Sequence, residues 1–141
     1  MPKDVGDVIA RVKGTKWSHL GRSSDGADCA GCVQLVLGEF GIDCRLPTAY
    51  PLRWWRSQPN KIAAHAHALG WAMIRNGQAA PLDVLAFSLS TTHGDHLGVF
   101  VGEGKFIHCW TEQASVVSLT DDLSRSARWI DRLVSVIRPT Q

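Results

Sequence analysis

Two stretches of the chain carry residues whose types and spacing could do chemistry. GADCAGCVQLVLGEFG holds Cys29 and Cys32 in a CxxC arrangement, and HLGVFVGEGKFIHCW holds His96 and His108. A CxxC pair is compatible with a disulfide, half of a zinc site, a redox centre, buried core thiols, or a nucleophile with a structural neighbour. The residues around each stretch must decide between these.

A zinc site or a redox centre is poorly supported by the other residues. Zinc ribbons need a second close pair of ligands, whereas Cys44 and Cys109 stand alone. His65 and His67 are two residues apart on a predicted helix, so they point away from each other. A redox CxxC of the thioredoxin type follows a β-strand, but the preceding GRSSDGAD is typical of a loop. We therefore predict no metal and no cofactor.

The cysteines are unevenly spaced, and a chain of this size can build a core without crosslinks. We interpret Cys32, Cys44 and Cys109 as buried structural thiols.

Cys29 differs from these in its position on a helix predicted over residues 29–40. Asp28 is a good N-cap, and Gly41 suits the end of the helix. The first residue of a helix lies among unsatisfied N–H groups at the positive end of the macrodipole, a setting that lowers the pKa of a thiol. Cys29 also shares the apolar face of this helix, so we expect its sulfur to face a sheet as a nucleophile.

The two histidines lie on a predicted β-hairpin that can supply a base. A three-residue turn over residues 102–104 pairs Val101 with Lys105 and makes His96 and His108 diagonal neighbours on one face. A two-residue turn places them on opposite faces unless a β-bulge corrects the register. A cysteine, a base and an orienting group together follow the triad logic of nucleophilic catalysis.

The remaining elements indicate an α+β fold. Residues 3–13 and about 61–75 are also predicted as helices, and Pro residues mark an irregular segment over 47–59. After Pro81 the chain changes to β-rich runs separated by turn residues, namely DVLAFSL, HLGVFV, KFIHCW, SVVSL and RLVSVIR. This order predicts N-terminal helices packed on one face of a roughly five-stranded antiparallel sheet.

Length and composition set the broad class. The 141 residues favour one domain over residues 1–141. The net charge is only +2, with Lys and Arg scattered, which argues against a nucleic-acid partner, although Trp54 and Trp55 beside two arginines could line a groove. No stretch approaches the roughly 20 apolar residues of a membrane span. The start, MPKDVGDVIARVKG, lacks the apolar run of a secretory signal, so we expect synthesis in the cytoplasm and separate delivery.

The same residues carry a family resemblance. GADCAGCVQLVL resembles the D-C-S-G-hydrophobic motif of the NlpC family of papain-like cell-wall cysteine peptidases. HLGVFVGEGKFIH resembles that family's H-V-G-I-Y-x-G-x-G-x-F-I-H segment, with the same spacing between the histidines. APLDVLAF resembles its P-G-D-L-V-F-F strand, and KGTKWSHLGRSSDGADC its G-T-x-Y-x-x-G-G lead-in. The similarity covers about residues 14–110 and implies a papain-like, NlpC-type fold.

The resemblance implies a cysteine peptidase or amidase that acts on peptidoglycan stem peptides, at bonds next to D-glutamate or diaminopimelate. By position, Cys29 is then the nucleophile, His96 the general base and His108 the residue that orients His96. The backbone N–H of Cys29 is expected to contribute to the oxyanion hole. The expected substrate-binding residues are Trp17, Asp28 and Trp110.

Three positions depart from the family pattern. Ala30 replaces the serine after the nucleophile, and Leu82 replaces the glycine of P-G-D. Trp17 stands where a tyrosine is frequent, and its indole N–H can donate where the phenol hydroxyl is lost.

The W-x-x-x-G-R-x-x-x-G-x-D-C form is most similar to single-domain members from phage tails and gene-transfer particles. We therefore expect an enzyme acting at the cell wall or periplasm as a virion tail component, with other tail or virion proteins as partners. The alternatives are a secreted antibacterial amidase effector, a non-catalytic tail-assembly protein, and an acyltransferase for lipid-like substrates. Retention of all three triad positions argues against the non-catalytic protein, and the lack of a membrane-associating apolar segment argues against the acyltransferase.

Overall fold

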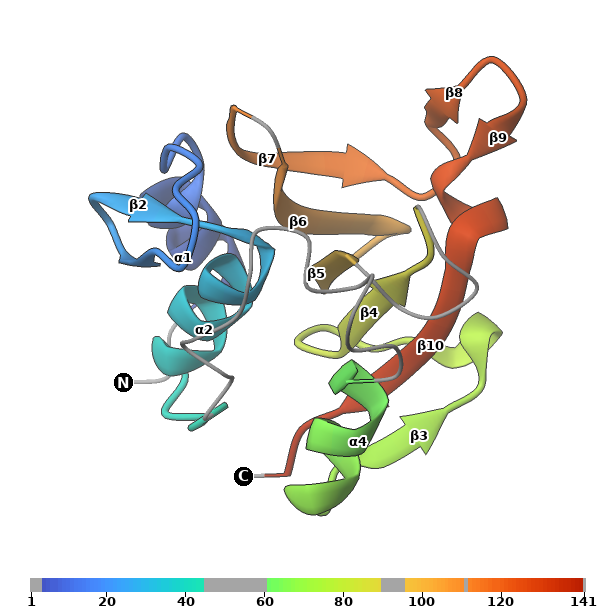
Figure 1. Cartoon of the computed structure of the whole chain (residues 1–141), viewed down its shortest axis with the longest axis horizontal. Helices are drawn as coiled ribbons and strands as arrows, with labels where there is room; N and C mark the ends of the chain where they lie inside the picture. Colours follow the sequence, from blue (N-terminus) through green and yellow to red (C-terminus); the bar gives the residue numbers. More distant parts are fainter. Residues whose placement is uncertain (1–3, 45–60, 90–95, 111, 141) are drawn as a thin grey trace.

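A computed structural model of the chain describes residues 4–44, 61–89, 96–110 and 112–140. The Pro-containing segment 47–59, with Trp54 and Trp55, lies outside the described residues. In Figure 1 the N-terminal helices lie to one side of a twisted antiparallel sheet, which the later part of the chain forms. The predicted α+β class is confirmed.

The central sheet has six described strands, one more than the sequence predicted. Their order in space is β3-β10-β4-β5-β6-β7, and every neighbouring pair is antiparallel. The strands are β3 (Ala72–Ile74), β4 (Val84–Phe87), β5 (His96–Gly102), β6 (Lys105–Trp110), β7 (Gln113–Ser118) and β10 (Leu133–Arg138). Five of them are the β-rich runs after Pro81, and β3 is the additional strand.

The helix predicted over residues 61–75 is wrong in its second half. The helix α4 covers Lys61–Ala68, and Gly70 then adopts a left-handed backbone conformation with φ 73°. The chain continues as β3, whose Ile74 pairs with Val136 of β10. A partner strand from the far end of the chain overrides the local helical pattern, and periodicity alone carries no information about that partner.

The two helices that cover the sheet agree with the prediction to within two residues at each end. These are α1 (Val5–Val12) and α2 (Cys29–Gly38). As predicted, Asp28 caps α2, accepting a 2.8 Å hydrogen bond from the Gly31 N–H. One buried apolar cluster joins α2 to the sheet, and its members include Val33, Val36, Leu37, Val84, Ala86, Leu97, Val99 and Ile107.

The predicted loop between these helices contains a small ribbon. The strands β1 (Arg22–Ser23) and β2 (Gly26–Ala27) pair antiparallel. Trp17 forms an isolated bridge with Ala27, which links the chain before the ribbon to the residues just ahead of α2. The start of α2 is therefore held between the ribbon and the sheet.

The opposite face of the sheet carries a second buried cluster, made of Leu85, Phe87, Phe100, Phe106, Leu119, Trp129 and Val136. Trp129 begins the 3-10 helix η2 (Trp129–Arg132), which follows the ribbon of β8 (Asp122–Ser124) and β9 (Ala127–Arg128). A further 3-10 helix, η1 (Asn76–Gln78), connects β3 to β4.

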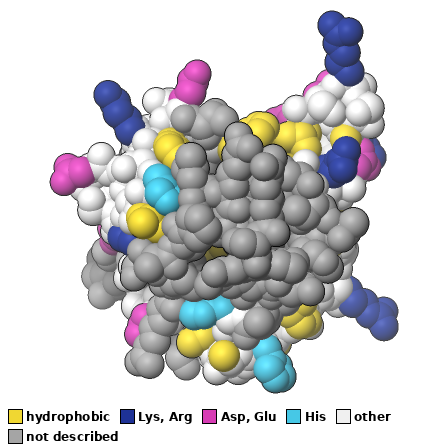
Figure 2. All heavy atoms as spheres, in the orientation of Figure 1, with side chains coloured by type: hydrophobic (Ala, Val, Ile, Leu, Met, Phe, Trp, Pro, Cys, Tyr) yellow, Lys and Arg dark blue, Asp and Glu magenta, His cyan; other side chains and the backbone are white. Residues whose placement is uncertain are grey.

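Charged side chains of both signs lie on the face of the molecule that Figure 2 shows. Lys and Arg side chains are spread around its rim, with Asp and Glu side chains at other points of the rim. Within the described ranges, every helix is too short or too polar to cross a membrane.

Candidate active site

The hairpin of β5 and β6 brings the two histidines to one face, by a different turn from the one predicted. Lys105 pairs with Gly102, not with Val101, so the turn has two residues, Glu103 and Gly104, both with positive φ. A register shift between Phe100 and Gly102 then restores the pairing of Phe100 with Phe106 and of Val99 with Ile107. The bulge is the correction that a two-residue turn requires if the histidines are to share a face.

The imidazoles of His96 and His108 are joined directly. His96 Nε2 lies 2.8 Å from His108 Nδ1, and the rings meet edge to face with centroids 5.1 Å apart. His96 is 4% exposed and His108 3% exposed. The bond occupies one nitrogen of each ring, so His96 keeps Nδ1 for a second partner.

Two tryptophans enclose this pair. Trp129 is 3% exposed, and its ring lies 5.9 Å from that of His96 and 4.9 Å from that of His108. Trp110, two residues beyond His108 on the same strand, lies 5.4 Å from Trp129 and is 42% exposed. Trp129 is not among the site residues predicted from the sequence, because no local spacing connects η2 to the histidines.

Burial keeps both imidazoles neutral. It holds the pKa of His96 well below the usual 6.5, and the neighbouring His108 lowers this pKa further. Burial also lowers the pKa of His108 to about 4. At neutral pH one ring must therefore donate an N–H to the other, and donation by His96 Nε2 leaves Nδ1 able to accept a proton.

Cys29 lies at the start of α2, beside the same end of the hairpin. Its side chain is half-buried, packs against the cluster under α2, and has backbone hydrogen bonds with Leu97 and Ala30. Leu97 is the residue after His96, so the sulfur approaches the strand next to the predicted base. Among the described residues, no hydrogen bond joins the Cys29 sulfur to either imidazole.

The expectation of a lowered pKa for Cys29 is wrong for this structure. Burial, and then the carboxylate of Asp28, raise the pKa of Cys29 to about 12. The backbone hydrogen bonds of Leu97 and Ala30 and the positive charge of Arg22 act in the opposite direction but are outweighed. The resting site therefore holds a neutral thiol and neutral imidazoles.

The other cysteines are buried, as predicted. All four cysteines of the chain are free thiols. Cys109 donates to the Ala27 carbonyl at 3.1 Å, and Cys32 and Cys44 lie in the cluster under α2. Their contacts are those of core residues.

The three expected substrate-binding residues have different surroundings. Trp17 is half-buried, and its ring stacks with His19 at 6.5 Å. Asp28 is 5% exposed, and its carboxylate takes part in the helix cap and in an ion pair with Arg22. Trp110 is the one of the three that presents a large exposed surface beside the histidines.

Gly98 has a structural role in placing His108. A Cβ at this position would lie 2.8 Å from the Phe106 ring, 3.1 Å from the Ile107 carbonyl and 3.5 Å from the His108 Cβ. Phe106 is fully buried and cannot retreat without disturbing the second cluster. We expect Gly98→Ala to lower the free energy of unfolding by about 1–3 kcal/mol in urea titrations, because overpacking a rigid core is destabilising.

Gly38→Ala is the matched control for this substitution, because a Cβ there meets nothing within 4 Å. It should leave the urea midpoint unchanged or raise it slightly. If Gly98→Ala and wild type have the same urea midpoint, β5 accommodates the added methyl group without loss of stability.

Comparison with known proteins gives the family. A sequence profile of the NlpC/P60 family matches residues 14–138. The chain belongs to the NlpC/P60 family. It is similar to murein DD-endopeptidase MepS/murein LD-carboxypeptidase of Escherichia coli K12, with 26% identity over 113 residues, covering 79% of this chain and 51% of MepS. The chain thus spans about half the length of the curated relatives that it matches.

Solved NlpC/P60 structures share the fold. A lipoprotein-like NLP/P60 family protein from Staphylococcus aureus has a TM-score of 0.67 at 20% identity, covering 97% of this chain and 40% of its own. RipD from Mycobacterium tuberculosis has a TM-score of 0.56 at 13% identity, covering 99% of both chains, and is described as a non-catalytic NlpC/p60 domain protein adapted to peptidoglycan binding. These likenesses confirm the predicted NlpC-type fold.

Proposed function

We propose that this NlpC/P60 protein is a peptidoglycan hydrolase that cleaves stem peptides by cysteine catalysis. Cys29 is the nucleophile, His96 the general base and His108 the residue that orients His96. The observation that carries the proposal is the buried 2.8 Å bond between His96 Nε2 and His108 Nδ1, at the end of β5 where Cys29 contacts Leu97. Such a bond fixes the ring and tautomer of a base whose other nitrogen serves the nucleophile.

The neutral resting state determines how the proton moves. With the pKa of Cys29 raised to about 12 and that of His96 lowered, a preformed thiolate–imidazolium pair is unfavourable. His96 Nδ1 therefore takes the thiol proton while the sulfur attacks the carbonyl carbon. The attack requires the His96 ring and the Cys29 side chain to come into contact, which substrate binding would have to favour.

The proton then returns to the leaving group. The backbone N–H of Cys29, at the start of α2, would stabilise the oxyanion of the tetrahedral intermediate. Its collapse breaks the amide bond, and the imidazolium of His96 gives the proton to the departing amine. Water, deprotonated by the same ring, then hydrolyses the thioester and frees the Cys29 thiol.

The substrate class is supported by the relatives. MepS is named a murein endopeptidase and carboxypeptidase, and we extend peptide-bond cleavage in peptidoglycan to this chain, at bonds next to D-glutamate or diaminopimelate. The exposed Trp110 lies on the same face as the two imidazoles, so it is placed to contact a bound peptide. We further propose that the enzyme acts at the cell wall as part of a phage-type tail; delivery as an antibacterial effector is the alternative.

A non-catalytic, peptidoglycan-binding role is the second candidate. One observation favours it: within the described chain, Cys29 is not hydrogen-bonded to an imidazole, and its thiol is neutral. RipD shows that the fold occurs in a protein described as non-catalytic. Against it stands the intact imidazole pair, which binding alone does not require.

Digestion of purified muropeptides separates the two candidates. We expect the protein to convert them to products whose masses identify the bond cleaved. Binding to sacculi without any new product, at enzyme concentrations comparable to the substrate, would instead establish the non-catalytic role.

A further inference from the structure

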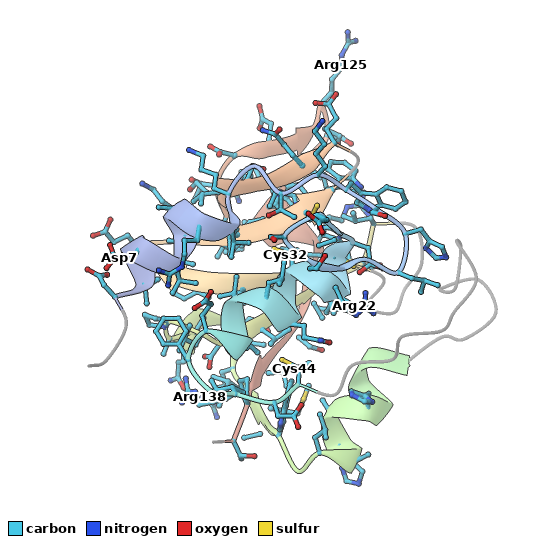
Figure 3. The ribbon with its side chains drawn as sticks, turned by 90° about the vertical axis from the view of Figure 1, so that its left-hand side faces the viewer. Asp7, Arg22, Cys32, Cys44, Arg125 and Arg138 are labelled. Carbon is cyan, nitrogen blue, oxygen red and sulfur yellow. The ribbon has the colours of Figure 1, made fainter. Side chains whose placement is uncertain are left out.

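Arg22 makes an ion pair with Asp28 at the start of α2, and the triad assigns this pair no role. Its Nη1 donates to Asp28 Oδ1 at 2.8 Å and to the Gly21 carbonyl at 2.9 Å. The side chains are 13% and 7% exposed, so the pair is shielded from solvent. Figure 3 shows Arg22 beside the first turn of α2.

The other contacts of Asp28 hold the same part of the chain. Oδ1 also accepts from the Gly31 N–H, and Oδ2 accepts from the Leu20 N–H at 3.1 Å. Leu20 has a left-handed backbone with φ 62°, which is unfavourable for a leucine and needs support. The carboxylate of Asp28 thus fixes both the loop before β1 and the first turn of the helix that carries Cys29.

The first turn of α2 and the loop before β1 pack closely against each other. A Cβ on Gly31 would lie 2.0 Å from the Gly21 carbonyl oxygen, the atom that Arg22 also binds. Arg22 therefore joins, through one guanidinium nitrogen, the loop and the cap that set the position of the nucleophile.

Among the described residues, the charged side chains that act on the Cys29 sulfur are Asp28, which raises the pKa of the thiol, and Arg22, which lowers it. The Cys32 thiol, which also interacts with Cys29, lies on the same helix and is neutral. From β5, the backbone of Leu97 reaches the sulfur, and the nearest titratable ring on that strand, His96, is also neutral.

We propose that Arg22 is a positioning residue for the nucleophile, which holds the Asp28 carboxylate in its capping geometry and balances the negative charge that the cap places beside Cys29. The Asp28 carboxylate is needed to cap the start of α2, but its negative charge opposes the negative charge that develops on the Cys29 sulfur during attack. Arg22 offsets this effect while leaving the cap intact.

The inference rests on the proposed role of Cys29, but its test reads the thiol directly. The test measures alkylation of Cys29 by iodoacetamide across pH, with the modified residue identified by peptide mass spectrometry. Alkylation needs the thiolate and no substrate. A wild-type protein that fails to cleave muropeptides would thus contradict the proposed function. The role of Arg22 is tested separately, by the alkylation rates of the variants.

Arg22→Gln should be alkylated about threefold to tenfold more slowly than wild type at pH 8, with its profile moved to higher pH. Arg22→Lys keeps the charge and should stay close to wild type. Arg22→Gln combined with Asp28→Asn should return near the wild-type rate, since both charges are removed and Asn can still cap a helix. Arg11→Gln is the matched control, because it removes a positive charge paired with Glu39, just after the opposite end of α2.

Two results would overturn the proposal. One is an Arg22→Gln profile that coincides with wild type; the other is equal slowing in the single and the double variant, which would leave only a structural role. If Arg22→Gln does not fold, Asp28→Asn alone decides, because it should be alkylated faster than wild type. An unchanged Asp28→Asn profile would then reject the charge balance.

Discussion

Cys29→Ala is expected to abolish muropeptide cleavage and to leave the fold intact. The substitution removes the sulfur that is proposed to form the thioester, and loss of a nucleophile costs about three orders of magnitude or more in rate. Cys29 is half-buried at the helix start, while the cap by Asp28 uses the backbone of Gly31 and does not involve the thiol. Product formation followed by mass spectrometry, with a urea titration beside it, checks both parts.

Cys32→Ala is the matched control within the same CxxC. Cys32 is fully buried in the cluster under α2, so its replacement should lower the free energy of unfolding by about 1 kcal/mol and retain most of the activity. Equal loss of activity in the two variants, or a metal bound in stoichiometric amount, would restore the redox or zinc interpretation of this motif.

The helix that carries the nucleophile was predictable because its signals are local. Asp28 as N-cap, the apolar positions of α2 and the glycine after its end are all written within about a dozen residues. The strands after Pro81 were predictable for the same reason. The strand β3 was not, since only its pairing with β10, from the far end of the chain, makes residues 72–74 extended.

In the candidate active site, too, features set by neighbouring residues were predictable, and features set by distant residues were not. The histidine spacing predicts a shared face, but the predicted three-residue turn is wrong, because a register shift near Gly102 is indistinguishable in sequence from a longer turn. Trp129 and the burial it provides could not be anticipated from spacing. The raised pKa of Cys29 follows from that kind of long-range packing, which outweighs the local effect of a helix N-terminus.

Burial of the imidazole pair should make the protein sensitive to acid. For His96 and His108 the pKa is lower in the folded chain than in the unfolded chain, so the unfolded chain binds more protons below pH 6.5. The contribution of the neutral rings to stability is thus fully present above pH 6.5 and is lost as the pH falls through the folded-state values. For His108, with a pKa of about 4, this amounts to about 3 kcal/mol.

His108→Gln removes one of these groups and should flatten the dependence. Urea titrations between pH 7 and pH 4 should show a smaller loss of stability for this variant than for wild type. A wild-type stability that does not change over this interval would mean that the rings are not held neutral by the fold.

The same pair sets the expected rate profile. His96→Ala removes the base and should reduce kcat/KM by at least about a hundredfold, whereas His108→Gln, which keeps a hydrogen-bonding side chain, should cost less. His108→Ala should lie between the two. Because the active form has a neutral thiol and a neutral imidazole, kcat/KM should stay flat across neutral pH and fall in acid, with apparent pKa values that belong to the coupled groups.

Measurement of kcat/KM from pH 4 to pH 9 for wild type and the three histidine variants tests these assignments, with stability followed at each pH to separate unfolding from titration. A bell-shaped dependence of kcat/KM on pH, with both limbs near neutral pH, would favour a thiolate–imidazolium pair in the resting enzyme. Near-wild-type activity of His96→Ala together with an inactive His108→Gln would show that the base is His108, with His96 as the residue that orients it. The 2.8 Å bond between the rings is compatible with either direction of donation, so the kinetics and not the distance assign the roles.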